Sequence, residues 1–140
     1  MLDLAKEREA HVDKRLRSDT TIWLTTVRRD GRPHTVPVWF LWDGATFLIF
    51  SQPDNLKIRN LRGNPNVTLA LDNTHDGGDV IAVEGKAELL TASASELNAP
   101  VYFEKYGASI QGMGQTPEGI AKSFSQPIRV TPAKFVSWGG

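Results

Sequence analysis

Hydrophobic residues recur at two different spacings along the chain. Within residues 4–16 the apolar side chains fall roughly on one stripe and charged side chains fill the other positions, which predicts an amphipathic helix. From Thr21 onward apolar and polar residues alternate, and alternation is typical of a half-buried strand. The alternating segments predict six β-strands, over residues 21–28, 33–42, 45–51, 66–72, 80–90 and 127–138.

Two Asp-Gly pairs separate the first three of these segments. Asp30-Gly31 and Asp43-Gly44 supply the positive-φ residues that a two-residue hairpin turn demands. The first three strands are therefore expected to form a meander. Gly85, inside the fifth predicted strand, indicates a bulge or a bend at that point.

A short helix is predicted directly after the third strand. Asp54 follows a proline and is a good N-cap for a helix over residues 55–62, which Gly63 and Pro65 end. A strand, a turn and a helix N-terminus therefore meet at one place.

Two further helical segments precede the last strand. Residues 93–106 predict an irregular helix that is interrupted by Pro100 and capped by Gly107. Thr116-Pro117 predicts the start of another short helix, which ends near Phe124.

Pro37 stands inside the second predicted strand, although proline cannot donate a hydrogen bond to a strand ladder. Two explanations remain open at this stage. Either a flat ring lies against the strand where pairing is interrupted, or the strand lies at the edge of the sheet. The side chains on both faces of segment 33–42 are largely apolar, so we expect both faces to be covered.

The helix that follows Asp54 is a candidate anion site. The N-terminus of a helix offers unpaired N–H groups and a positive dipole end, and Lys57 in the first turn adds a charge that suits phosphate. Ser51 and Asn55 could add neutral donors. The alternative is that Lys57, Arg59 and Arg62 form one solvated face of a surface helix.

Composition narrows the function classes. The chain has 140 residues, with 16 basic and 16 acidic side chains, so we expect one domain, residues 1–140, and neither a nucleic-acid nor a membrane partner. Cysteine is absent, which excludes disulfides and a thiolate nucleophile. His11, His34 and His75 lack ligand spacing, so no metal site is expected. The charged N-terminal segment resembles no leader sequence, which favours a cytoplasmic protein.

Five short motifs occur in a fixed order between residues 22 and 136: D-G-x-P, P-V-W-F, S-Q-P, K-x-R-N-L and N-P-x-V. In this combination the chain resembles the split-barrel flavin and deazaflavin oxidoreductases, which include pyridoxamine 5'-phosphate-oxidase-like proteins, and most of all their coenzyme F420-dependent branch. The resemblance implies a mainly β fold with short helices, a six-stranded antiparallel split β-barrel (the FMN-binding split barrel). It also implies a homodimer with each cofactor in a groove at the dimer interface.

The resemblance also implies a set of cofactor-binding residues. Val36, Pro37, Val38 and Trp39 would back the deazaflavin ring. The tail phosphate would be surrounded by Ser51, Gln52, Asn55, Leu56, Lys57 and Asn60. No catalytic side chain is assigned, because the cofactor carries the hydride chemistry.

One departure from the family pattern favours F420 over FMN. FMN-using pyridoxamine phosphate oxidases carry an arginine and a lysine along the second strand as R-x-x-L-L-K, whereas the equivalent strand here reads VPVWFLW and has no cation. The sequence therefore predicts an oxidoreductase that uses reduced coenzyme F420 on a small conjugated or quinone-like substrate. The alternatives are an FMN-dependent oxidase or flavin reductase, and a non-catalytic protein that binds flavin, deazaflavin or haem.

Overall fold

The computed structural model describes residues 2–92 and 99–139. Within those ranges no helix combines the length and the hydrophobicity that crossing a bilayer requires. The helices and strands, in chain order, are α1 (Glu7–Ser18), β1 (Ile22–Val27), β2 (Pro33–Val38), β3 (Leu41–Trp42), β4 (Phe47–Ser51), α2 (Leu56–Gly63), β5 (Asn66–Asp72), β6 (Asp79–Leu89), α3 (Ala99–Gly112), α4 (Pro117–Ser123) and β7 (Gln126–Gly139).

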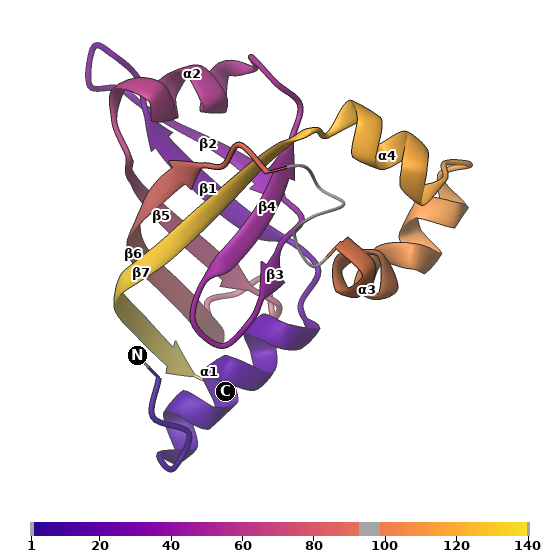
Figure 1. Cartoon of the computed structure of the whole chain (residues 1–140). Helices are drawn as coiled ribbons and strands as arrows, with labels where there is room; N and C mark the ends of the chain where they lie inside the picture. The colour runs from indigo at the N-terminus through magenta and orange to yellow at the C-terminus, as the bar shows by residue number, and fades with distance from the viewer. Residues whose placement is uncertain (1, 93–98, 140) are drawn as a thin grey trace.

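All strands of the described chain belong to one antiparallel sheet, in the order β2-β1-β5-β6-β7-β4-β3. The sheet curls into a barrel-like wall, with α2 over one end and α1 over the other (Figure 1). This architecture confirms the predicted split barrel. The sheet has seven strands rather than six because the predicted strand over residues 33–42 divides into β2 and β3, and residues 39–40 lie outside the ladder.

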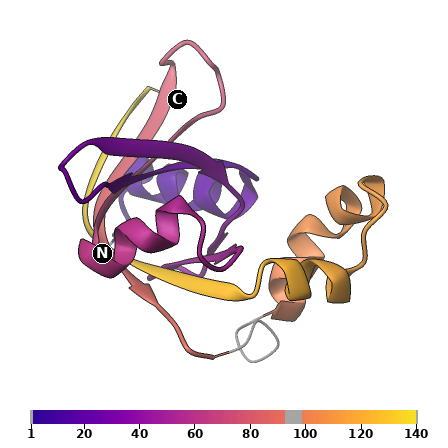
Figure 2. The same cartoon turned by 90° about the horizontal axis from the view of Figure 1, so that it is seen from above.

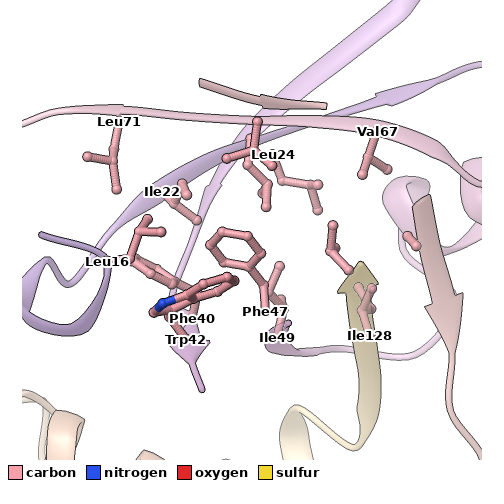
Figure 3. Packing of buried hydrophobic residues seen from close by; sticks show 14 of the residues in the cluster. Leu16, Ile22, Leu24, Phe40, Trp42, Phe47, Ile49, Val67, Leu71 and Ile128 are labelled. Carbon is pink, nitrogen blue, oxygen red and sulfur yellow. The ribbon is translucent and has the colours of Figure 1, made fainter. Parts of the chain in front are cut away.

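The interior of the curled sheet forms the main hydrophobic core. Alternate side chains of the strands point inward and lose nearly all exposure to solvent, as period-two patterning requires. Figure 3 shows Phe40, Trp42 and Phe47 at the centre of this core, with aliphatic side chains from the surrounding strands and α1 around them. Trp42 and Phe47 lie with ring centroids 4.6 Å apart.

A second hydrophobic cluster lies outside the barrel wall. All five residues of β4 are buried: Phe47 and Ile49 face the barrel interior, whereas Leu48 and Phe50 belong to the cluster formed with α3 and α4. The helical partners in that cluster are Tyr102, Tyr106, Ile110 and Ile120. Figure 2 shows α3 and α4 beside the barrel rather than over its ends, so these two helices cover only one part of the wall.

Strand β2 lies at the edge of the sheet and pairs only with β1. Pro37 therefore costs no ladder hydrogen bond, and of its two explanations the edge strand is the one that the topology shows. The expectation that both faces of segment 33–42 are covered is wrong for β2, where alternate residues are exposed.

Two turns differ from their predicted form. In the first hairpin only Gly31 has a positive φ, and the Arg28 N–H donates to the Arg32 carbonyl 2.8 Å away, so the loop has three residues rather than two. Asp54 does not cap α2. It adopts a left-handed φ of 63° and forms an ion pair with Arg62, whereas Asn55 is the N-cap and accepts from the Ile58 N–H.

Helix boundaries also shift where the predicted stop signals prove weaker than packing. Pro100 lies at the second position of α3, where proline costs no helical hydrogen bond, so it does not interrupt the helix. Gly107 lies inside α3 rather than at its end, because Tyr106 and Ile110 on either side of it are anchored against β4. The start of the predicted segment, residues 93–98, lies outside the described residues. Thr116 caps α4 as predicted.

Helix α1 starts at Glu7 rather than at the predicted residue 4 and is held at the β6–β7 end of the sheet by charge. Asp79, at the start of β6, is buried and accepts from His11 at 2.8 Å, and the Arg15 guanidinium forms an ion pair with it. Burial alone would raise the pKa of the Asp79 carboxyl, but these two partners outweigh burial and hold the pKa below its ordinary value. The carboxylate is therefore the ionic anchor of the helix.

Candidate functional site

A cavity of about 410 Å³ lies where the end of β2, the outer face of β4 and the helices α3 and α4 meet. A cavity of this size is typical of small-molecule sites. Its walls are mostly apolar. Both the barrel and the helical region contribute to its lining, which includes Pro37, Val38, Trp39, Phe50, Tyr102 and Phe124.

The Trp39 indole is held in the cavity wall by α3. It stacks on the Tyr106 ring with centroids 4.5 Å apart and an angle of 5° between the planes. The Tyr106 hydroxyl accepts from the Phe40 N–H at 2.9 Å and lies within donating distance of the Thr20 carbonyl, at 2.7 Å. Residues 39–40 are outside the ladder, so the Phe40 N–H has no acceptor on a neighbouring strand. The Tyr106 hydroxyl is its acceptor instead and holds the cavity wall in position.

Lys105 adds a second anchor at the same point. Its ammonium donates to the Phe40 carbonyl at 2.9 Å and lies 4.0 Å from the centroid of the Phe40 ring. Burial lowers the pKa of Lys105 to about 8. Both polar groups of the Phe40 backbone are thus satisfied by α3.

Lys57 is the only ionisable cation among the described residues that line the cavity. It is the second residue of α2 and is half-buried, and burial lowers the pKa of its amine. Lys57 therefore places a positive charge in the first turn of α2, beside the positive end of the helix dipole.

Ser51 and Asn55 hold the turn before α2. The Asn55 amide donates to the Ser51 hydroxyl at 3.2 Å, and that hydroxyl donates to the Gln52 carbonyl at 2.9 Å. Ser51 has no exposed surface, whereas Gln52 is exposed. In this arrangement Ser51 and Asn55 orient the helix and its lysine.

The structure brings together only part of the residue set predicted for the cofactor. Pro37, Val38, Trp39 and Lys57 line the one cavity. Val36 is half-buried on β2 opposite Leu24 and does not line it. Leu56 and Asn60 lie on the other flank of α2, along a separate cleft, and the buried Asn60 amide donates to the Thr26 hydroxyl at 2.9 Å. Six of the ten predicted residues therefore divide between two hollows, and the other four, namely Val36, Ser51, Gln52 and Asn55, line neither.

Sequence reasoning missed the helical wall of the cavity. Tyr102, Ile120 and Phe124 line it together with Met113, and none of them stands in a recognisable motif. One signal was available: Tyr102, Tyr106 and Ile110 repeat every four residues, the spacing of one helix face. The stripe was not recognised because the predicted helix ended at Gly107, before Ile110.

Comparison with known proteins agrees with the architecture. The profile of a family described as pyridoxamine 5'-phosphate oxidase matches residues 9–139. No curated protein sequence matches the chain. Among solved structures, an F420 reductase is 23% identical with a TM-score of 0.69, and the match covers 89% of this chain and 94% of that one.

Two other structural matches concern different ligands. A FAD-binding protein from Mesorhizobium loti is 20% identical with a TM-score of 0.68, and 91% of each chain is covered. HutZ, the haem storage protein from Vibrio cholerae, is 17% identical with a TM-score of 0.62, and the match covers 93% of this chain and 92% of that one. At these identities the likeness shows a shared fold.

Removing the Tyr106 hydroxyl tests how the cavity wall is held. We expect Tyr106→Phe to lower the free energy of unfolding by about 1–3 kcal/mol, because the Phe40 N–H would lose its only acceptor in a buried place. Urea denaturation followed by tryptophan fluorescence measures the change. Thr35→Val is the control, since it removes an exposed hydroxyl bond to Thr25. Equal small losses in both variants would show that the Tyr106 hydroxyl does not hold the wall.

Proposed function

The chain belongs to the pyridoxamine 5'-phosphate oxidase family, and on that footing we propose that it is an oxidoreductase in which reduced coenzyme F420 transfers hydride to a small conjugated or quinone-like substrate. The observation that carries the proposal is the composition of the cavity between β2, β4, α3 and α4. A flat, immobilised wall at Pro37–Trp39 suits a fused-ring system, and the single ammonium of Lys57 suits a phosphate.

The choice of F420 over FMN rests on where cations are absent. The segment 36–42 carries none, and Lys57 alone supplies charge to the described lining of the cavity. A second-strand cation pair of the kind that holds the flavin phosphate in FMN-using relatives has no counterpart here. The structural likeness to an F420 reductase supports the same choice.

Hydride transfer needs little from the protein beyond placement. The bound cofactor supplies two electrons and one hydrogen as hydride to an electron-poor carbon, and a proton from solvent completes the reduction. Trp39 and Pro37 would fix the ring plane, Lys57 would hold the phosphate, and the apolar side chains of α3 and α4 would exclude water from the opposite side. Those same helical side chains would select flat, apolar substrates.

We also propose that the protein is a homodimer with the cofactor at the interface. Trp23 and Trp138 are each 51% exposed on the outer face of the sheet. Cross-strand pairing aligns an apolar row with them, which runs Pro37, Trp23, Ala70, Ala82 and Val136. Such a stripe is typical of an interface. Because Pro37 belongs both to this row and to the cavity lining, a second copy seated on the row would close the open side of the cavity.

Titration with both cofactors tests the proposed cofactor. Tryptophan fluorescence reports on binding because Trp39 lies in the cavity wall. We expect F420 to quench it at lower concentrations than FMN does. Oxidation of reduced F420 is then followed with a panel of enones and quinones. Tight binding of FMN without a response to F420 would refute the choice of cofactor. Binding of F420 without turnover on any acceptor would identify a carrier.

Replacing Lys57 tests the phosphate position. Lys57→Met should weaken F420 binding by about 1–3 kcal/mol, because a charge-assisted hydrogen bond to phosphate is lost. Lys14→Met, which removes an exposed lysine on α1, is the matched control. A dissociation constant that stays the same in Lys57→Met would place Lys57 on a solvated helix face.

The same lysine predicts a pH dependence. Burial lowers the pKa of Lys57, so its ammonium deprotonates below the ordinary pH for lysine. The binding of F420 to the protein should therefore be strongest below that lowered pKa, and it should weaken as the pH rises through it. Lys57→Arg should abolish the alkaline loss, because a guanidinium stays charged. An alkaline limb that persists in Lys57→Arg would assign the titration to another group.

Disrupting the apolar row tests the dimer. Trp23→Lys should shift the protein from dimer to monomer in light scattering, and should weaken cofactor binding in parallel, because it places a charge within the row, next to Pro37. Gln111→Lys adds the same charge on exposed α3 and should leave both properties unchanged. A Trp23→Lys protein that remains dimeric would exclude this face as the interface.

A further inference from the structure

Tyr102 is the most deeply buried polar side chain in the described lining of the cavity. It belongs to α3, and only 3% of its surface is exposed. Its ring meets the Phe50 ring edge-on, with centroids 4.7 Å apart and 90° between the planes, and it lies 5.0 Å from the Tyr106 ring. Neighbours from β4 and from α3 therefore hold the Tyr102 ring in place.

The Tyr102 hydroxyl has no hydrogen-bond partner among residues 2–92 and 99–139. A buried tyrosine hydroxyl usually has one, because withdrawing a polar group from water without a partner costs free energy. Tyr106, one turn further along α3, follows this rule: its hydroxyl bonds to the Phe40 N–H and to the Thr20 carbonyl. The fold therefore uses the Tyr106 hydroxyl and leaves the Tyr102 side chain at the cavity.

The other side chains of the lining narrow the class of ligand. None of the described lining residues carries a carboxylate, so a cationic ligand would find no opposite charge there. The neutral side-chain donors are Thr21, Trp39 and Tyr102, of which Thr21 is exposed and Trp39 is half-buried. A ligand that fits this wall is apolar over most of its surface and offers an acceptor to the buried Tyr102 hydroxyl. A carbonyl group conjugated to a flat ring has both properties.

Burial also fixes the protonation state of this hydroxyl. It raises the pKa of the Tyr102 phenol, and the neighbouring Tyr106 phenol adds to the increase, so Tyr102 stays a neutral O–H donor at neutral and moderately alkaline pH. In a low-dielectric place such a donor stabilises an oxygen that gains negative charge. It does so without giving up its proton.

We propose that the Tyr102 hydroxyl donates a hydrogen bond to the carbonyl oxygen of the substrate and stabilises the negative charge that develops there. The inference rests on the proposed function for the hydride step, whereas carbonyl binding needs no cofactor. Hydride forms a C–H bond at the far carbon of the conjugated C=C bond, and the electron pair of that bond moves toward the oxygen. A proton from solvent then completes the reduction, and Tyr102 keeps its own proton.

Two small ligands that differ by one carbonyl oxygen test the binding step. Indanone and indane share a fused ring system, and only indanone has a carbonyl group. Each is titrated into the full-length protein and into Tyr102→Phe, with tryptophan fluorescence as the reporter. We expect Tyr102→Phe to weaken the binding of indanone about three- to tenfold, the effect of one hydrogen bond, and to leave indane unchanged. Ser109→Ala removes an exposed hydroxyl from the same helix and should change neither.

Two further measurements separate a hydrogen bond from packing. The infrared carbonyl band of bound indanone should lie at lower wavenumber in the unchanged protein than in Tyr102→Phe, because donation to the oxygen weakens the C=O bond. With reduced F420 and cyclohexenone, Tyr102→Phe should lower kcat by about 10²-fold and change KM much less, because the bond strengthens as charge develops on the oxygen.

Several results would overturn the inference. Equal weakening of indanone and indane in Tyr102→Phe would show that Tyr102 only packs the wall. An unchanged carbonyl band, or no binding of indanone by the unchanged protein, would exclude the carbonyl site. An unchanged kcat would refute the role of Tyr102 in the reaction while the proposed function stands. Indanone binding through Tyr102 without any response to F420 would support the carbonyl site and refute the proposed function.

Discussion

Strand β4 must be buried on both of its faces, and the rest of the architecture follows from that constraint. Its side chains alternate between the barrel core and the outside of the wall, yet all five are buried. A strand of this kind is stable in water only when a second layer covers its outer face, and α3 and α4 are that layer (Figure 2). Because the two helices contact the wall over a limited area, a cavity remains beside Phe50, between them and the end of β2.

The short helix α2 positions charged side chains at both the cavity and the cleft. Its N-terminal turn is held by the Ser51–Asn55 hydrogen bond, and its middle is held to β1 through Asn60 and Thr26. Those contacts leave two flanks exposed. Lys57 lines the cavity, whereas Leu56, Arg59 and Arg62 line the cleft on the opposite flank. One rigid element thus separates a ring-sized apolar hollow from a wide cationic one.

Local signals predicted the elements whose boundaries depend on local chemistry. The strand at Asn66–Asp72, the bulge at Gly85 and the cap at Thr116 all lie where the sequence indicates. The errors fall where a distant contact overrides a local preference. Asp54 is a good cap in isolation, but its pairing with Arg62 and its left-handed backbone leave that role to Asn55. Residues 39–40 continue the apolar pattern of a strand, but the Phe40 N–H donates to the Tyr106 hydroxyl instead of to a neighbouring strand.

The sequence by itself predicted most of the strands and the helix that carries Lys57 in its first turn, because period-two patterning and helix start and stop signals act over a few residues. The closure of the strands into a split barrel was implied by the resemblance to a known family. Only the tertiary structure decided which of the predicted cofactor residues meet. Pro37 and Lys57 share a cavity, whereas Asn60, three residues after Lys57, belongs to the opposite flank. The physical reason is that a cavity wall is assembled from side chains far apart in the chain. The positions of α3 and of the β1–β2 hairpin depend on the whole core.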